Sequence, residues 1–193
     1  MKYNEHLDLK GKHAFLSPST YRWINYEPEK IMQLYTGKQA VDRGTRLHAI
    51  AAELISEKIK LPRTKTTFNM YVNDAIGFGL VPEQVLYYSN NCFGTADAIS
   101  ELDQVLATKK LRVHDLKTGV TPAHMEQLLI YVALFCLEYS FKPSELADIT
   151  CRLYQSDTIE EYHPTSEDIV PIMDAIISND KLLRRADNGG ITE

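Results

Sequence analysis

The stretch LRVHDLKTG, residues 111–119, decides the fold, because it predicts a strand that ends in a charged pair. Polar TKK precedes it and a Thr-Gly turn follows it, as expected at the two ends of a strand. Side chains alternate along a strand, so Val113, Asp115 and Lys117 point to the same face. This aspartate and lysine are therefore a candidate catalytic pair.

A hairpin is predicted immediately before this strand. The segments EQVLYYSN (83–90) and CFGTADAIS (92–100) are short and rich in residues that favour strands, and the polar SNN marks the turn. Alternation places four side chains of the second segment on one face: Phe93, Thr95, Asp97 and Ile99. We therefore expect Asp97 on a strand that neighbours Asp115.

Two helices are predicted around these strands. Apolar residues recur at helical spacing in VDRGTRLHAIAAELISEKIK, which predicts an amphipathic helix over about residues 41–60. The segment TPAHMEQLLIYVALFCLEYSF predicts a second helix, with Thr121 as its N-cap and Pro122 at its first position. Its run LLIYVALFCL is apolar almost all round, so we expect this helix to be buried against the sheet.

The remaining segments complete an α/β pattern. DITCRLYQ, residues 148–155, predicts a further strand. SEDIVPIMDAIIS, residues 166–178, predicts a last helix that Pro171 kinks or delays. The expected fold class is α/β, with a central mixed β-sheet flanked by helices.

The composition is that of a globular chain. Its 193 residues, of which 44% are apolar, suit a single domain, 1–193, with a flexible polar tail from about residue 185. No apolar run approaches the roughly 20 residues that cross a bilayer, and the start is polar, so we expect a cytoplasmic protein without membrane contact. The net charge of −5 argues against a protein that coats nucleic acid, but basic clusters such as LPRTKTT leave room for a local DNA groove.

The tripeptide Asp-Leu-Lys occurs twice, at residues 8–10 and at residues 115–117. The first copy lies in a polar leader with no strand pattern and no acid upstream of it. The second copy follows Asp97 on a predicted neighbouring strand and precedes the buried helix. An isolated Asp-x-Lys is explained as well by an ion pair, so only the second copy is a candidate active site.

Two carboxylates on adjacent strands suit a divalent cation. Asp97 and Asp115 can bind Mg²⁺ or Mn²⁺ through hard oxygens, and the Leu116 backbone carbonyl can add a third ligand. Lys117 can orient an attacking water and stabilise the charge that develops on a phosphate. This set of residues suits the hydrolysis of a phosphodiester.

Four further polar residues are candidates on weaker grounds. His48 lies at the edge of the apolar stripe of the first helix, where a lone histidine is more often a core residue than a ligand. Gln127 and Tyr131 are four residues apart and share a helical face, with His124 one turn earlier. An amide in an apolar helix needs a partner, which a phosphate, a water or a backbone carbonyl would supply.

Five motifs, in order, resemble the RecB-type branch of the PD-(D/E)XK nuclease superfamily, and especially its small bacteriophage-encoded members. LSPSTYRWINYEPE resembles their lead-in, GTRLH their Gly-x-x-x-His, FGTAD their Gly-x-x-Asp, VHDLKTG their Asp-x-Lys and QLLIY their Gln-x-x-x-Tyr. The resemblance covers most of residues 15–176 and implies a restriction-endonuclease-like core. The residues it implies for metal binding are His48, Asp97, Asp115 and the Leu116 carbonyl. Those it implies for catalysis and substrate binding are Asp97, Asp115, Lys117, Gln127 and Tyr131.

The resemblance implies a Mg²⁺- or Mn²⁺-dependent DNA exonuclease of recombination, replication or repair. An endonuclease of the same fold and a catalytically idle DNA-binding or assembly subunit are the alternatives. Implied partners are DNA, a single-strand annealing recombinase or helicase, and further copies of the chain. Tyr26 stands where some relatives have a cysteine, and no carboxy-terminal cysteines follow, so we expect no iron–sulfur cluster; we find no ATP-binding motif either. Glu83 either matches an acid of some relatives or is a surface residue.

Overall fold

The structure is a computed structural model that describes residues 14–189. These residues divide into two compact units, of which the first ends at Arg43 and the second begins at Gly44. The sequence predicts a single domain, and all the predicted site residues lie in the second unit. The first Asp-Leu-Lys copy, from Asp8 to Lys10, lies outside the described residues.

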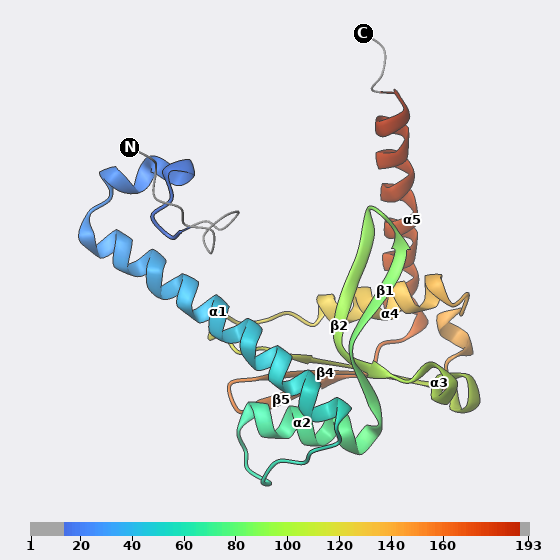
Figure 1. The fold of residues 1–193 in the computed structure, drawn as a ribbon. Helices are drawn as coiled ribbons and strands as arrows, with labels where there is room; N and C mark the ends of the chain where they lie inside the picture. Colours follow the sequence, from blue (N-terminus) through green and yellow to red (C-terminus); the bar gives the residue numbers. More distant parts are fainter. Residues whose placement is uncertain (1–13, 190–193) are drawn as a thin grey trace, which may run out of the picture. The chain divides into compact units, whose positions relative to one another are not determined.

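The described residues form helices and strands that are mixed along the chain, as Figure 1 shows. The elements in chain order are η2 (Pro18–Asn25), α1 (Pro28–Ser56), α2 (Thr67–Phe78), β1 (Leu80–Ser89), β2 (Cys92–Ser100), α3 (Leu102–Thr108), β3 (Lys110–Leu116), α4 (Glu126–Glu138), η3 (Pro143–Glu145), β4 (Asp148–Gln155), β5 (Thr158–Tyr162) and α5 (Ser166–Gly189). No helix within residues 14–189 has the length and apolar content that crossing a membrane requires.

The five strands form one mixed sheet in the order β1-β2-β3-β4-β5. β3 and β4 are parallel, and the other neighbouring strands are antiparallel. The predicted hairpin is formed by β1 and β2, although β1 begins earlier than expected, at Leu80. The predicted class, an α/β fold with a central mixed sheet flanked by helices, is confirmed.

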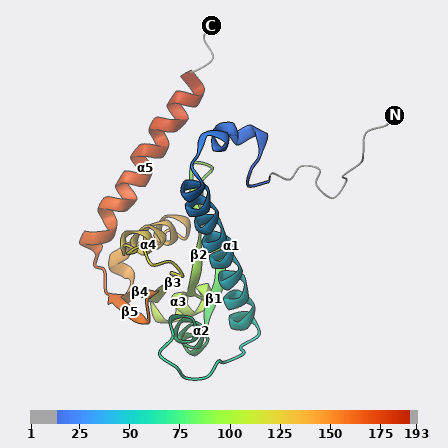
Figure 2. The same cartoon turned by 90° about the vertical axis from the view of Figure 1, so that its left-hand side faces the viewer.

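Helices cover both faces of the sheet, and β3 contributes to both cores. Leu111 and Val113 lie in the core formed with α4 and α5. Leu116 and Tyr154 lie in the core formed with α2 and the second half of α1. Figure 2 shows α4 and α5 on the side of the strands opposite to α2. Consecutive residues of β3 therefore pack on opposite sides of the sheet.

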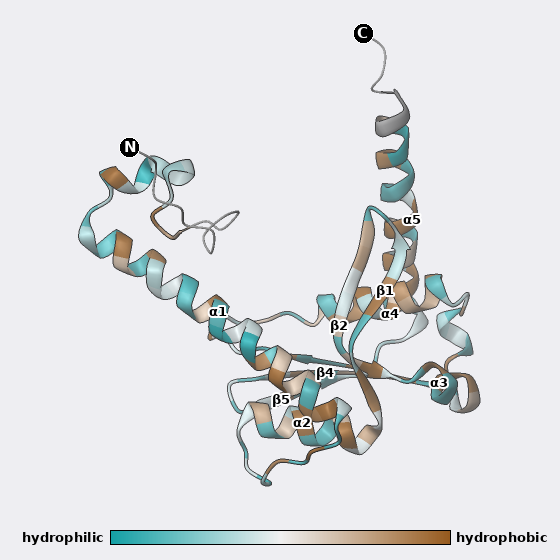
Figure 3. Ribbon diagram, in the orientation of Figure 1, coloured by the Kyte–Doolittle hydropathy of each residue, from teal (hydrophilic) through white to brown (hydrophobic). Residues whose placement is uncertain are grey.

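Helix α4 begins at Glu126, so the predicted start at Thr121 and Pro122 is wrong. The cause is a long-range contact. The Gln155 side chain, on β4, accepts a hydrogen bond from the Ala123 backbone N–H and donates to the carbonyls of Gly119 and Thr121. These bonds hold the segment before α4 in a non-helical conformation. Figure 3 shows α4 hydrophilic in its first turn and hydrophobic through its middle, as the sequence predicts for a buried helix.

Two other helices are longer than expected. α1 begins at Pro28 rather than near residue 41, with Pro28 and Glu29 in its first turn, where both residue types are favourable. α5 begins at Ser166, as predicted, with Pro171 inside the helix, so of the two expected effects of this proline the delayed start is absent. Thr165 and Asp168 cap this start, since the Asp168 carboxylate accepts from the Thr165 backbone N–H and hydroxyl. α5 continues to Gly189, beyond residue 185, where the tail is expected to begin.

The described part of the first unit is organised by aromatic side chains. Trp23 Nε1 donates a hydrogen bond to the Ser17 carbonyl at 2.9 Å, across η2. The rings of Phe15 and Tyr35 meet edge to face, with centroids 5.2 Å apart. These contacts pack the lead-in LSPSTYRWINYEPE on itself and on the first half of α1.

Candidate functional site

Asp97 lies where β2 changes its packing. Ala96 belongs to the core on the α4 side, whereas Ala98 belongs to the core on the α2 side. Strict alternation would place these two residues on one side, so the predicted common face of Phe93 to Ile99 is interrupted at Asp97. Asp97 Oδ2 accepts a hydrogen bond from the Leu116 backbone N–H at 2.8 Å. The carboxylate thereby joins β2 to the end of β3.

His48 approaches Asp97 from α1, and its Nδ1 lies 3.3 Å from Asp97 Oδ2. The helix passes close to the segment after β3, because a Cβ on Gly44 would lie 2.8 Å from Thr118 Oγ1. Gly44 therefore provides the space that lets GTRLH deliver His48 to the site. The hydrogen bond to Asp97 raises the pKa of His48, although burial opposes this effect; the charges of Asp97, Asp115 and Glu83 raise it further.

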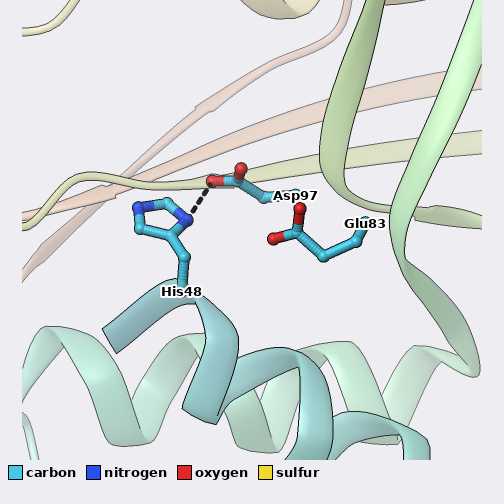
Figure 4. Close-up of side chains that lie close together, drawn as sticks. All are labelled: His48, Glu83 and Asp97. Atoms are coloured by element: carbon cyan, nitrogen blue, oxygen red, sulfur yellow. Dashed lines mark ion pairs between the residues drawn. The ribbon is translucent and has the colours of Figure 1, made fainter. Parts of the chain in front are cut away.

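Glu83 completes a group of three. Its backbone lies opposite Asp97, between the paired positions Pro82–Ala98 and Gln84–Ala96. One ligand atom from each of His48, Glu83 and Asp97 lies within 4.8 Å of the other two. Figure 4 shows that the three side chains come from one helix and two adjacent strands and converge. The sequence leaves the role of Glu83 open, because a register shift between Tyr87 and Ser89 decides which residue of β2 lies across from it.

The backbone of Glu83 has a φ of 51°, in the left-handed region that residues other than glycine rarely adopt. Such a conformation costs about 1–3 kcal/mol and persists only where its surroundings enforce it. Burial raises the pKa of Glu83, and the charge of Asp97 raises it further, while His48 lowers it. The hairpin thus holds a carboxylate at a strained position beside another carboxylate.

Asp115 is the most buried acid of the site, with 1% of its surface exposed. Its Oδ1 accepts a hydrogen bond from Lys117 Nζ at 3.1 Å. Its Oδ2 lies 2.9 Å from the same nitrogen but receives no hydrogen bond of suitable geometry from the described residues. Burial and then the charge of Asp97 raise the pKa of Asp115, and Lys117 lowers it. Asp115 lies outside the group of His48, Glu83 and Asp97, but near enough for Asp97 to affect it.

The Leu116 carbonyl faces the same region. The Lys117 backbone N–H donates to the Tyr154 carbonyl on β4 at 2.9 Å. In a planar trans peptide the C=O and the following N–H point in opposite directions. The Leu116 carbonyl therefore points away from β4, toward the side on which Asp97 lies. This orientation would let the carbonyl oxygen reach a cation held beside Asp97.

Lys117 begins a chain of polar contacts that runs to α4 and back to β2. Lys117 Nζ donates to Gln127 Oε1 at 2.7 Å, and Gln127 Nε2 lies 3.2 Å from Tyr131 Oη. Tyr131 Oη donates to the Thr95 carbonyl at 2.6 Å. A Cβ on Gly94 would lie 3.1 Å from the Tyr131 ring, so the glycine of FGTAD makes room for this tyrosine. Gln127 and Tyr131 thus hold Lys117 in place.

His124 does not join this chain of contacts. It is exposed in the segment before α4, because the helix begins two residues later than His124. The prediction that His124 shares a helical face with Gln127 and Tyr131 is therefore wrong. The physical reason is the same set of Gln155 hydrogen bonds that keeps residues 119–123 out of the helix.

The donor set fits a hard divalent cation. Three carboxylates, those of Glu83, Asp97 and Asp115, face one lysine and one histidine, and mutual repulsion contributes to the raised pKa of both Glu83 and Asp115. Carboxylate and carbonyl oxygens with one imidazole suit Mg²⁺ or Mn²⁺. A cation would also give the buried Asp115 Oδ2, whose one close partner among the described residues is the Lys117 ammonium, a second partner.

No family model, curated protein or solved structure matched this chain when it was compared with each. The resemblance to a nuclease family therefore rests on the five motifs alone.

Proposed function

We propose that this chain is a divalent-metal-dependent deoxyribonuclease that hydrolyses phosphodiester bonds, acting as an exonuclease. One observation carries the proposal. A nearly inaccessible carboxylate, that of Asp115, lies beside the group of His48, Glu83 and Asp97, and the one close partner of its Oδ2 among the described residues is the Lys117 ammonium, at 2.9 Å. A structural ion pair has no need of two further carboxylates that repel it, whereas a cation site does.

The residues that would hold the metal are His48, Glu83, Asp97, Asp115 and the Leu116 carbonyl. When bound, Mg²⁺ or Mn²⁺ polarises a phosphate oxygen and lowers the pKa of water. Loading the site also requires His48 to be neutral, so the proton that Asp97 stabilises on His48 must leave. We therefore expect metal affinity to rise with pH through the range in which His48 titrates.

Lys117 supplies the chemistry that the carboxylates cannot. Its ammonium group lies against Asp115 and is held from the other side by Gln127, so it has a fixed position at the edge of the site. An ammonium group fixed there orients water for in-line attack and stabilises the negative charge that develops on the phosphate. Tyr131 fixes Gln127 in turn, and so acts through Lys117.

The alternatives are an endonuclease of the same fold and a catalytically idle DNA-binding or assembly subunit. Two features oppose an idle subunit: the left-handed backbone of Glu83 and the burial of the Asp115 carboxylate beside the charge of Asp97. Both cost stability, and a scaffold gains nothing from either. The preference for DNA ends, and the partnership with a phage recombinase or helicase, are supported by the motif resemblance alone.

The test uses three substrates: end-labelled linear duplex, single strand and closed circular DNA, each with Mg²⁺, Mn²⁺ or a chelator. An exonuclease degrades the linear substrates and spares the circle, and the chelator stops it. Cleavage of the circle assigns the endonuclease, and no cleavage of any substrate with either metal assigns the idle subunit. Asp97→Asn is the negative control, and Asp74→Asn, on the other face of the sheet, is the matched control that should cleave normally.

A further inference from the structure

We propose that the face of the β1–β2 hairpin that carries Glu83 and Asp97 continues into a stacking site for the bases of single-stranded DNA, formed by Tyr87 and Phe93. This inference rests on the proposed function, since it extends the path of the substrate beyond the cation site. Its ligand is an unpaired nucleobase near the scissile phosphate.

The register of the hairpin aligns the two sites. Tyr87 pairs with Phe93, and Val85 pairs with Thr95. The next position along the strands is Glu83 opposite Asp97, where the alternation breaks. Up to that position Leu86 and Ala96 pack toward α4, so Val85, Thr95, Tyr87 and Phe93 lie on the other face, and the aromatic pair is four residues along the strands from the carboxylates. Four residues of a strand span about 13 Å, which a single DNA strand covers in a few nucleotides.

The aromatic pair is exposed although its surroundings are ordered. Phe93 is 62% exposed and Tyr87 45%, and their rings stack with centroids 6.3 Å apart. Val85, on the same face, is 48% exposed. Large apolar side chains that are gathered on one face and left in contact with solvent indicate an interaction surface.

The opposite face of the hairpin is anchored. Leu86 and Ala96 are fully buried in the core with α4. At the turn, the Ser89 hydroxyl and the Asn91 amide both donate to Asp180 Oδ1 on α5, at 2.6 Å and 3.1 Å. The aromatic pair is therefore mounted on a fixed support, which lowers the entropy cost of binding a flexible strand.

The chemistry of this face selects bases rather than phosphates, and a single strand rather than a duplex. Residues 80–100 contain no lysine or arginine, so the hairpin offers π surfaces but no positive charge. Every base has a π face that stacks on an aromatic ring, and this contact tolerates any sequence. In a duplex those faces are already covered by neighbouring bases. An unpaired strand that enters or leaves the cation site is therefore the occupant that this face fits.

The experiment measures binding of a single-stranded oligonucleotide that carries 2-aminopurine, with Ca²⁺ in place of the catalytic metal. Phe93→Ala and Tyr87→Ala should each raise Kd on the order of tenfold, which is the size expected when one stacked base is lost. Phe93→Leu, which keeps apolar surface without a ring, should lose as much, and Phe93→Trp should bind normally. Tyr162→Ala removes an exposed strand aromatic at the other edge of the sheet and should have no effect. Mn²⁺ binding should be unchanged in all five variants.

Three outcomes overturn the inference. If wild-type protein binds and cleaves DNA but Phe93→Ala and Tyr87→Ala bind it equally well, stacking is excluded and the proposed function stands. If Phe93→Leu binds like wild type, the contact is apolar and involves no stacking. If the wild type sediments as a dimer that Phe93→Ala dissociates without loss of DNA binding, the occupant is a second copy of the chain. Wild-type protein that neither binds nor cleaves DNA would refute the proposed function itself.

Discussion

His114 and Asp115 are neighbours in β3, both are buried, and their side chains lie on opposite faces of one sheet. Their surroundings differ in charge balance. Asp115 shares its side with two further acids, Glu83 and Asp97, against Lys117 and His48. On the other face, Arg112 and Arg152 lie near His114, and both guanidinium groups pack on the Phe78 ring. One face of the strand thus gathers acids that are close to one another, whereas on the other face Arg112 is paired with Asp148, and Arg152 with Asp74 and Glu161, around a neutral ring.

The hydrogen bonds differ in the same way. The Tyr154 hydroxyl donates to Asp74 at 2.8 Å, so at its 3.2 Å contact with His114 it must accept, and Nδ1 carries the proton of the imidazole. His114 Nε2 is then a neutral acceptor that finds no donor among residues 14–189. Such a nitrogen costs little, because it carries no charge. The His114 side is therefore a network around a neutral ring, whereas the Asp115 side gathers anionic oxygens that a cation can bind.

The largest effect on cleavage should come from removing an acid on the Asp115 side of the sheet. Removing an acid on the His114 side should affect stability but not cleavage. Asp97→Asn and Asp115→Asn should abolish cleavage and weaken Mn²⁺ binding, while thermal stability without metal stays equal or rises because repulsion is relieved. Asp74→Asn should lower the melting temperature, because Arg152 and Tyr154 lose an anionic partner, but it should leave activity per folded molecule intact. Calorimetry with Mn²⁺ and an end-labelled DNA assay measure both effects. Unchanged Mn²⁺ binding in both Asp97→Asn and Asp115→Asn would contradict the cation site.

The next effect concerns the lysines of the two Asp-Leu-Lys copies. Lys117→Ala should reduce cleavage on the order of a hundredfold or more, because it removes a fixed electrostatic group, but it should retain the metal. Lys10→Ala should be nearly silent, since no acid or strand pattern accompanies the first copy in the sequence. Single-turnover cleavage rates and Mn²⁺ titrations of the two variants make the comparison. Equal losses would mean that the choice between the copies is wrong.

The third effect is a pH dependence of the free energy of unfolding that arises from His114. Burial, followed by the charges of Arg152 and Arg112, lowers the pKa of His114 to about 3. In the unfolded chain the same ring titrates near 6.5, so below that pH the unfolded state binds the proton more tightly. His114 therefore contributes stability above pH 6.5, and this contribution is lost as the pH falls toward 3. Between pH 7.5 and pH 5 the loss is about 2 kcal/mol.

Urea unfolding of the wild type and of His114→Leu at several pH values isolates this contribution. His48 acts in the opposite direction, since its raised pKa gives stability at low pH that is lost as the pH rises. The difference between the two proteins is free of the contribution of His48 to this pH dependence, because both proteins contain His48. His114→Leu should lose less stability on acidification than the wild type. Parallel curves for the two proteins would mean that His114 is protonated in the folded state.

Local patterns predicted most of the fold and part of the site. Alternation identified β2 and β3, and the SNN turn marked the hairpin of β1 and β2. Asp97 comes near Asp115 through the pairing of β2 with β3, at Ala98–His114 and Ile99–Val113, which no short turn sets. The start of α4 was missed because it depends on Gln155, which is far along the chain. Thr121 and Pro122 are good start signals, but the hydrogen bonds from Gln155 outweigh them.

Two features of the site could not be inferred from residue types. Glu83 reaches the cluster with a left-handed backbone, which no local pattern at a glutamate predicts. The close contacts of Gly44 with Thr118 and of Gly94 with Tyr131 join segments that are distant in sequence. They give the glycines of GTRLH and FGTAD a physical role: each makes room for a residue of another motif.

The smallest effect on cleavage should come from Gln127, the α4 residue that contacts Lys117. Gln127 is exposed and its partners are the side chains of Lys117 and Tyr131, so Gln127→Leu should change stability by less than about 0.5 kcal/mol. Cleavage should nevertheless fall, by less than for Lys117→Ala, because Lys117 loses the contact that fixes it opposite Asp115. Tyr131→Phe is the matched change: it strands the Thr95 carbonyl and should cost roughly 0.5–1.5 kcal/mol, with a smaller effect on cleavage. Melting temperature and single-turnover rate on the two purified variants separate these roles. A destabilised but fully active Gln127→Leu would show that the glutamine supports the fold and does not position the lysine.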